Sequence, residues 1–271
     1  MTCSIWEKKD SIAQTLWKTG RAGFPIYDMH GHMGQHYAIY MPRCEPADVV
    51  KHIQRIGVRK LIFSHHEVLW GNMRNAKVVD ICKKYPESLR MYVGIVPQHP
   101  DYIKEDLALF DKWAPYAVGL KFLADYHWTS INDKAYEYAL DFANERGIPT
   151  LFHTWGSSQY NGSKNMLKIV QKYKNMKIFL AHCIFGDWEG AVHCAKENSN
   201  VYLELTAVPG ERGRIEELVH AIGSEHILYG TDMPWFDEYQ AVGGVVSAKI
   251  TEDDMRNILY RNAQRLMGPD F

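Results

Sequence analysis

The residues with the clearest chemical potential are His30 and His32, which are separated by a single glycine. The apolar stretch from Phe24 to Ile26 precedes them and is typical of the start of a buried strand. Because side chains two residues apart on a strand point to the same side, the two imidazoles would project together. Paired neutral imidazoles suit a zinc-like ion, at metal–nitrogen distances of about 2.0–2.1 Å. Asp28 has the same parity and could orient one ring from behind.

A His-x-His pair is weak by itself, because short motifs often match by chance and two polar residues in a turn would look the same. The elements around the pair are more informative. Strands are predicted over residues 24–30, 59–64, 89–96, 117–123, 148–153, 177–182, 200–206 and 226–231. Segments with apolar residues at helical spacing separate them, as in residues 46–56, 133–146 and 214–222.

Strands that alternate with helices imply a parallel sheet, and eight such units imply a closed barrel. We therefore expect an α/β fold in which residues 1–271 form a single (β/α)8 TIM-like barrel domain, with a short N-terminal helical extension whose inward residues are Ile5, Ile12 and Leu16. An open doubly wound sheet is the alternative, but the first predicted strand is not followed by its Gly-rich turn. After the last strand we expect a loop of about twenty residues and then a helix opened by a capping box at Thr251 and Asp254.

Polar residues gather at the predicted carboxyl ends of the strands, where such barrels carry their chemistry. Lys121, Glu204, Thr206 and Asp232 lie there, and so do eight of the 13 histidines: His30, His32, His65, His66, His99, His127, His153 and His182. Surface histidines would scatter over helices instead. Several imidazoles with one carboxylate form a metal-ligand set, which favours a metal site over a purely structural role.

These features resemble the amidohydrolase superfamily, and within it the amidohydrolase-related branch of decarboxylases of aromatic or unsaturated acids and lactone hydrolases. The resemblance is carried by residues 28–32 (DMHGH), 119–122 (GLKF), 152–154 (FHT), 180–183 (LAHC) and 229–235 (YGTDMPW), and by residues 258–266 with Asn262-Ala263. It implies a distorted barrel with one divalent metal ion, usually zinc, with manganese as the alternative. Its ligands would be His30, His32, His153 and Asp232, and His182 would lie beside the attacking water or the substrate.

The chemistry of these residue types fits the implied roles. Asp232 could also act as the catalytic base that takes a proton from water, and His182 could polarise a substrate oxygen. Lys121 has two interpretations. In binuclear relatives a lysine at this strand end is carboxylated and bridges two metals, whereas here it could pair with a substrate carboxylate as a point charge.

Aromatic and basic residues give the only indication of the substrate. Five tryptophans follow carboxyl ends of strands, namely Trp70, Trp128, Trp155, Trp188 and Trp235. They could line a pocket for a planar or sugar-like molecule, or they could pack loops and an oligomer interface. Arg43 and Arg74 could bind a substrate carboxylate, or they could be solvated surface residues. We therefore expect Lys121, Trp155, Trp235 and Arg43 to bind substrate.

Composition narrows the partners and the compartment. The net charge of −1 gives no electrostatic case for nucleic acid or an anionic membrane surface. The 5 cysteines are an odd, scattered set that indicates reduced thiols, and residues 1–23 are too charged for a signal peptide. We expect a cytoplasmic protein that binds a small molecule, binds neither nucleic acid nor membrane, and could form a homodimer.

Three functions remain open from the sequence. The first is hydrolysis of an ester, lactone or amide by a metal-activated water. The second is non-oxidative decarboxylation, in which the active residue would protonate carbon. The third is a barrel that has lost catalysis and only binds, which would predict missing ligands, although every expected position is filled.

Overall fold

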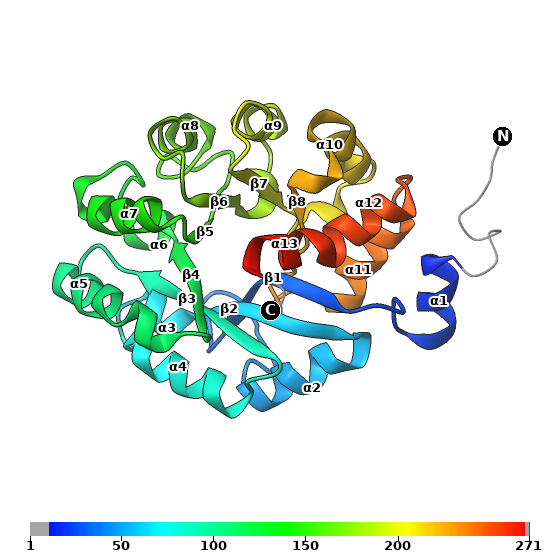
Figure 1. The fold of residues 1–271 in the computed structure, drawn as a ribbon, viewed down its shortest axis with the longest axis horizontal. Helices are drawn as coiled ribbons and strands as arrows, with labels where there is room; N and C mark the ends of the chain where they lie inside the picture. The colour runs from blue at the N-terminus through cyan, green and yellow to red at the C-terminus, as the bar shows by residue number, and fades with distance from the viewer. Residues whose placement is uncertain (1–10, 269–270) are drawn as a thin grey trace.

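The computed structural model describes residues 11–268 and 271, and its centre is an eight-stranded parallel sheet in sequential order (Figure 1). The strands are β1 (Ile26–Met33), β2 (Val58–His65), β3 (Leu89–Ile95), β4 (Ala117–Phe122), β5 (Pro149–Phe152), β6 (Lys177–Leu180), β7 (Val201–Glu204) and β8 (Ile227–Leu228). The ring closes between β8 and β1, where Gly31 forms a bridge with Met233 and the Met29 amide donates to the Tyr229 carbonyl over 3.0 Å. The predicted (β/α)8 barrel is confirmed.

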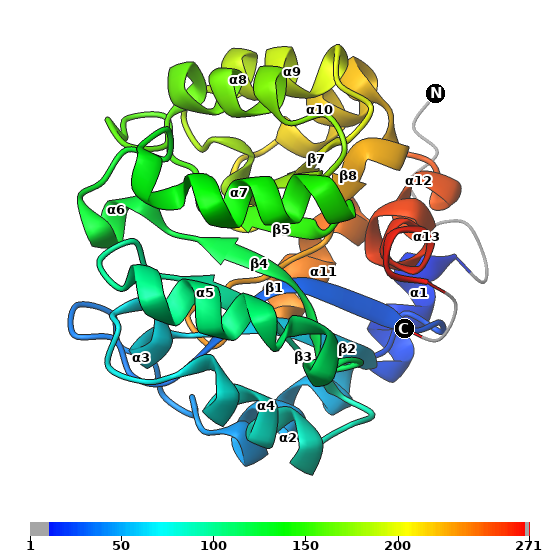
Figure 2. The ribbon, with the colours of Figure 1, turned by 60° about the vertical axis from the view of Figure 1, so that its left-hand side comes forward.

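The helices surround this barrel (Figures 1 and 2). The α-helices are α1 (Ile12–Thr19), α2 (Pro46–Ile56), α3 (His66–Leu69), α4 (Asn75–Lys84), α5 (Pro100–Ala108), α6 (Ala124–His127), α7 (Lys134–Arg146), α8 (Ser163–Lys172), α9 (Trp188–Lys196), α10 (Arg214–Ile222), α11 (Glu238–Ser247), α12 (Glu252–Arg256) and α13 (Asn262–Met267). Short 3-10 turns lie at η1 (Phe110–Trp113), η2 (Ala181–Cys183), η3 (Val208–Gly210) and η4 (Ser224–His226), and a π-helical turn, η5 (Asn257–Arg261), joins α12 to α13. None of these helices has the length and hydropathy that a membrane span requires.

Helix boundaries follow the capping chemistry of the sequence. Pro46 opens α2 and Gly57, with φ of 96°, ends it in the left-handed region, where glycine has no steric penalty. The Asp133 side chain caps α7 by accepting from the Ala135 amide over 2.9 Å. The predicted capping box is confirmed, since Thr251 and Asp254 satisfy each other's backbone amides.

The buried apolar residues form two clusters. The larger lies between the strands and the helices. The smaller collects buried residues from seven different strands, which can meet only inside the barrel: Tyr27, Met29, Ile62, Tyr92, Leu151, Phe179, Tyr202 and Leu228. Ala263 and Leu266 of α13 pack against them. This filled interior leaves the carboxyl ends of the strands as the place for polar side chains.

Several predicted boundaries were wrong. β1 continues to Met33, so His32 lies on the strand rather than in the loop after it. β6 ends at Leu180, and His182 lies in η2 with φ of 61°. The loop predicted after β8 contains α11, whose apolar residues and two adjacent glycines, Gly243 and Gly244, give no clear amphipathic stripe. The N-terminal helix is confirmed only over α1, and Ile5 lies outside the described residues.

Candidate metal centre

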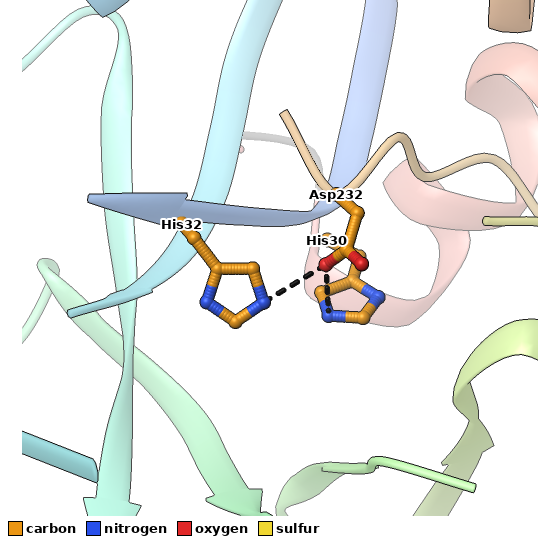
Figure 3. Close-up of side chains that lie close together, drawn as sticks. All are labelled: His30, His32 and Asp232. Atoms are coloured by element: carbon orange, nitrogen blue, oxygen red, sulfur yellow. Dashed lines mark ion pairs between the residues drawn. The ribbon is translucent and has the colours of Figure 1, made fainter. Parts of the chain in front are cut away.

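Three predicted ligands converge at the carboxyl end of the barrel (Figure 3). The Oδ1 atom of Asp232 lies 2.8 Å from His32 Nε2 and 3.2 Å from His30 Nε2. The two histidines come from β1, and Asp232 follows β8, the neighbouring strand in the closed ring. The three side chains are buried, and their ligand atoms all lie within 4.8 Å of one another. In the described part of the chain this is the group whose donor atoms could share one ion.

The donor set fits a divalent cation. Asp232 Oδ1 is buried and has no hydrogen-bond partner in the described residues, although two ring nitrogens face it. A buried carboxylate oxygen without a hydrogen bond is costly, and an ion that accepts its lone pair together with those of the two rings would remove the cost. Two imidazoles and a carboxylate are a ligand set that zinc accepts.

Glu204 fixes the orientation of His30. Its Oε2 atom lies 2.8 Å from His30 Nδ1, and both side chains are fully buried. The other oxygen, Oε1, accepts from the amide and the hydroxyl of Thr206 over 2.7 and 2.6 Å. A carboxylate behind Nδ1 selects the tautomer whose Nε2 lone pair faces the metal position.

This role was predicted for Asp28, and that prediction was wrong. Asp28 Oδ1 accepts from the backbone amide of His30 over 2.9 Å, and Oδ2 accepts from the Thr231 hydroxyl over 2.5 Å. Asp28 therefore ties the backbone of β1 to the segment that carries Asp232, but it contacts neither ring nitrogen of His30. Burial, and then Glu238, raise the pKa of Asp28 well above its usual range.

His182 and His153 form a second pair beside the group. His182 Nε2 lies 3.1 Å from His153 Nδ1, and the ring centroids of His182 and His30 are 5.2 Å apart. The second nitrogen of His182, Nδ1, is buried and has no hydrogen-bond partner among the described residues. His153 lies outside the three-residue group, with its Nε2 3.6 Å from Asp125 Oδ2. Its predicted place as a metal ligand stays a prediction.

Lys121 reaches the same position from β4. Its side chain is fully buried, and Nζ lies 2.9 Å from His30 Nε2, the nitrogen that faces Asp232. Burial lowers the pKa of Lys121 to about 8. Because the Lys121 amine is fully buried next to His30 Nε2, it could contact only a substrate atom that lies at the candidate metal position.

The electrostatics suit neutral imidazoles and an ionised carboxylate. Burial, followed by the charge of Lys121, lowers the pKa of His30 well below its usual range. Burial also lowers the pKa of His182, and it lowers the pKa of His153 to about 4. Burial alone would raise the pKa of Asp232, but His30 and His32 outweigh this effect and hold it well below normal. Neutral imidazole and ionised carboxylate are the forms that bind metal.

The other rim histidines have structural partners. His127 lies 2.8 Å from the Tyr136 hydroxyl and 2.7 Å from the Leu69 carbonyl. His66 contacts the Gly34 carbonyl over 3.1 Å and stacks on His32 with 4.5 Å between ring centroids. The clustering of histidines in the sequence therefore predicted the end of the barrel at which His30, His32 and Asp232 converge. Several of the other histidines instead contact loops through hydrogen bonds.

The tryptophans divide into different environments. Trp155 lies against the site, with its ring centroid 5.5 Å from that of His182 and 4.6 Å from that of Phe185. Trp70 stacks on His66, whereas Trp188 packs on Phe185 and lies under the Arg214 guanidinium. Trp128 and Trp235 are exposed.

Arg43 and Trp235 line one groove, which begins at Met233 beside Asp232 and has a volume of about 360 Å³. Trp155 and His153 line a separate hollow of about 540 Å³. Arg74 lies apart from both of these hollows; its guanidinium donates to Glu105 and Asp106 over 2.9 Å each and stacks on Tyr102.

Known proteins resemble this chain in sequence and in fold. A metal-dependent hydrolase of Mycoplasma genitalium, itself uncharacterised, is 23% identical over 278 residues, covering 89% of this chain and 98% of that protein. An uncharacterised TIM-barrel protein from Bordetella bronchiseptica superposes with a TM-score of 0.75 at 14% identity, over 90% of this chain and 98% of that one. A dihydroxybenzoic acid decarboxylase from a Polaromonas species, with bound manganese and the inhibitor 2-nitroresorcinol, gives a TM-score of 0.73 at 16% identity, over 90% and 96% of the two chains.

These two structural likenesses show the fold, and the family is shown by the sequence. The family model described as Amidohydrolase matches residues 27–268, from the strand that carries His30 and His32 to the end of the last helix. The chain is thus a member of the amidohydrolase family and a metal-dependent enzyme of that family.

Proposed function

We propose that the protein hydrolyses a small-molecule ester, lactone or amide with a metal-activated water. The observation that carries the proposal is the convergence of one ligand atom each from His30, His32 and Asp232 within 4.8 Å of one another at the carboxyl end of the barrel. A divalent cation held by them would supply Lewis acidity and lower the pKa of water at the site. We propose zinc, with manganese as the alternative because the similar Polaromonas structure holds it.

Asp232 is the proposed base. Its lowered pKa keeps the carboxylate ionised at neutral pH, so Oδ2 can take a proton while Oδ1 faces the two imidazoles. The same carboxyl group can then return that proton to the leaving group. His182 is proposed to hydrogen bond to the substrate oxygen, and His153 beside it to complete the ligand set.

Decarboxylation of an aromatic or unsaturated acid is the second candidate, and Lys121 is the observation that favours it. Its buried amine, next to His30 Nε2, is a cation that could hold a substrate carboxylate at the metal position. Asp232 or His182 would then deliver a proton to carbon rather than remove one from water. The similarity to a dihydroxybenzoic acid decarboxylase supports this candidate at the level of the fold.

One experiment separates the two reactions. Purified protein loaded with zinc or manganese is assayed on a panel of lactones, esters, amides and aromatic acids, with acid release and carbon dioxide release followed in parallel. Acid release without carbon dioxide, lost in Asp232→Asn, supports hydrolysis. Carbon dioxide release from the aromatic acids, with no turnover of the lactones, would contradict hydrolysis and support decarboxylation.

We also infer a reducing compartment, the cytoplasm. Cys44, Cys82, Cys183 and Cys194 are free and buried, and no two of them are paired.

A further inference from the structure

The hollow beside His153 has a composition that narrows the substrate. It is lined by Asp125, His153, Trp155, Ser157, Ser158, Gln159 and Tyr160, and its volume is about 540 Å³. Asp125 comes from α6, and the other residues come from the segment between β5 and α8. Because His153 hydrogen bonds to His182, the hollow opens directly beside the candidate metal centre.

The polar groups of the hollow suit hydroxyl groups. Asp125 is held in place, since its Oδ1 accepts from Ser158 over 2.7 Å and its Oδ2 accepts from Asn161 over 2.6 Å. A carboxylate has about four acceptor positions, so Asp125 retains capacity for a further donor. The side chains of Ser157 and Gln159 make no hydrogen bonds with the described residues, and both can donate and accept.

The charge of the hollow argues against an anionic ligand. Asp125 is the one acidic residue that lines it, and no lysine or arginine lines it. A carboxylate on the substrate would face the Asp125 carboxylate, and no cation lines the hollow to offset the repulsion. Binding such a substrate would therefore cost free energy.

We propose that this hollow binds an uncharged, hydroxyl-rich part of the substrate, such as the ring of a sugar lactone, and that Asp125 determines this specificity. Trp155 supplies an apolar surface beside the polar groups, the combination that places a ring and fixes its orientation. The inference rests on the proposed hydrolase function and specifies its substrate class. An anionic substituent would instead suit the separate groove that Arg43 lines.

The test compares D-glucono-1,5-lactone with δ-valerolactone, which has the same ring without hydroxyl groups. Each kcat/KM is divided by the uncatalysed rate of ring opening. We expect the wild-type protein to prefer the hydroxylated lactone by about tenfold to a thousandfold, since two or three hydrogen bonds are at stake. Asp125→Asn should reduce the preference at least about tenfold, mainly through KM for the hydroxylated lactone.

Two further variants distinguish loss of substrate contacts from misfolding of the Asp125→Asn protein. The double variant Ser157→Ala, Gln159→Ala removes exposed side chains that make no hydrogen bonds in the described structure, and it should also lower the preference. Asp80→Asn, an exposed matched substitution on α4, should leave the preference unchanged.

The outcomes separate the two proposals. Turnover of δ-valerolactone with no preference for the hydroxylated ring, or a preference for a lactone with a carboxylate substituent, would overturn the inference and leave the hydrolase function standing. No turnover of any lactone, ester or amide would remove the hydrolase function itself.

Discussion

The Nδ1 atom of His30 lies 2.8 Å from the Oε2 atom of Glu204, a residue 174 positions later in the chain. This pair joins β1 to the end of β7 beneath the candidate metal centre. Because a histidine with its Nδ1 held by a carboxylate presents Nε2 as the lone-pair donor, the contact prepares His30 to bind an ion.

Glu204→Gln should therefore weaken metal binding without unfolding the protein. The amide keeps the shape of the side chain but loses the charge, and such substitutions behind a ligand typically cost about 10–100-fold in affinity. Titration with zinc against a competing chelator measures the change. Glu145→Gln, an exposed matched change on α7, should bind metal like the wild type. Equal affinity in Glu204→Gln and the wild type would mean that the carboxylate does not orient His30.

Gly230→Ala should disturb the same contact by crowding it. A Cβ atom at this position would lie 2.2 Å from Glu204 Oε1 and 2.8 Å from His30 Cβ, closer than real contacts allow. Overpacking of this kind costs about 1–3 kcal/mol of stability, and here it also displaces a ligand. Urea unfolding and metal titration report the two effects.

The control for this prediction is Gly243→Ala on α11, where a Cβ atom would meet nothing within 4 Å. That variant should be unchanged or up to about 1 kcal/mol more stable, since alanine favours helix over glycine. If Gly230→Ala unfolds like Gly243→Ala and binds metal normally, the close packing described here is wrong.

His182→Asn should remove catalysis and leave metal binding largely intact. His182 has φ of 61°, a conformation that asparagine tolerates better than most residues, so the backbone of η2 should persist. Loss of a donor to the substrate oxygen lowers kcat by about 10²–10³-fold. Steady-state kinetics and metal analysis of the same preparation separate the two roles. Loss of metal in step with activity would make His182 a ligand.

The stability of the metal-free protein should fall as the pH drops below about 6.5, the ordinary pKa of histidine. Burial lowers the pKa of His153 to about 4 and that of His66 to about 2. The unfolded chain thus takes up these protons at a higher pH than the folded protein, so stability is full above about 6.5 and is lost as the pH falls toward the folded pKa values. Each group can contribute about 1 kcal/mol per pH unit in this window.

Urea midpoints of the metal-free protein at pH 7, 6 and 5 check this dependence. His66→Gln should flatten the curve, because the neutral amide removes one of the titrating groups. A midpoint that rises between pH 7 and pH 5 would show that these imidazoles are not held neutral by burial.

Sequence reasoning predicted what local patterns encode. The helices α2 and α10 were predicted because each has a clear apolar stripe, and the barrel was predicted from the regular alternation of strands and helices. The position of Asp232 after β8 placed it at the rim with the histidines. These features depend on residues close together in the chain.

The remaining features depend on contacts between distant residues. Glu204 was recognised as a rim residue, but its pairing with His30 depends on how β7 and β1 face each other across the barrel. Asp28 has the parity of a residue behind the site, and only the structure shows its partner to be Thr231. The helix α11 was not predicted, because its adjacent glycines interrupt the apolar periodicity of the segment. Its residue Glu238 is buried and accepts a hydrogen bond from the Tyr229 hydroxyl.

Metal analysis of the purified protein tests the central claim most directly, namely that His30, His32 and Asp232 hold one divalent ion. After dialysis against zinc and gel filtration, the wild-type protein should retain about one equivalent per chain, the stoichiometry of a single catalytic site. The variants His32→Ala and Asp232→Ala, folded by circular dichroism, should each retain far less. Wild-type protein without stoichiometric metal, or an Asp232→Ala variant that retains as much as the wild type, would contradict the account.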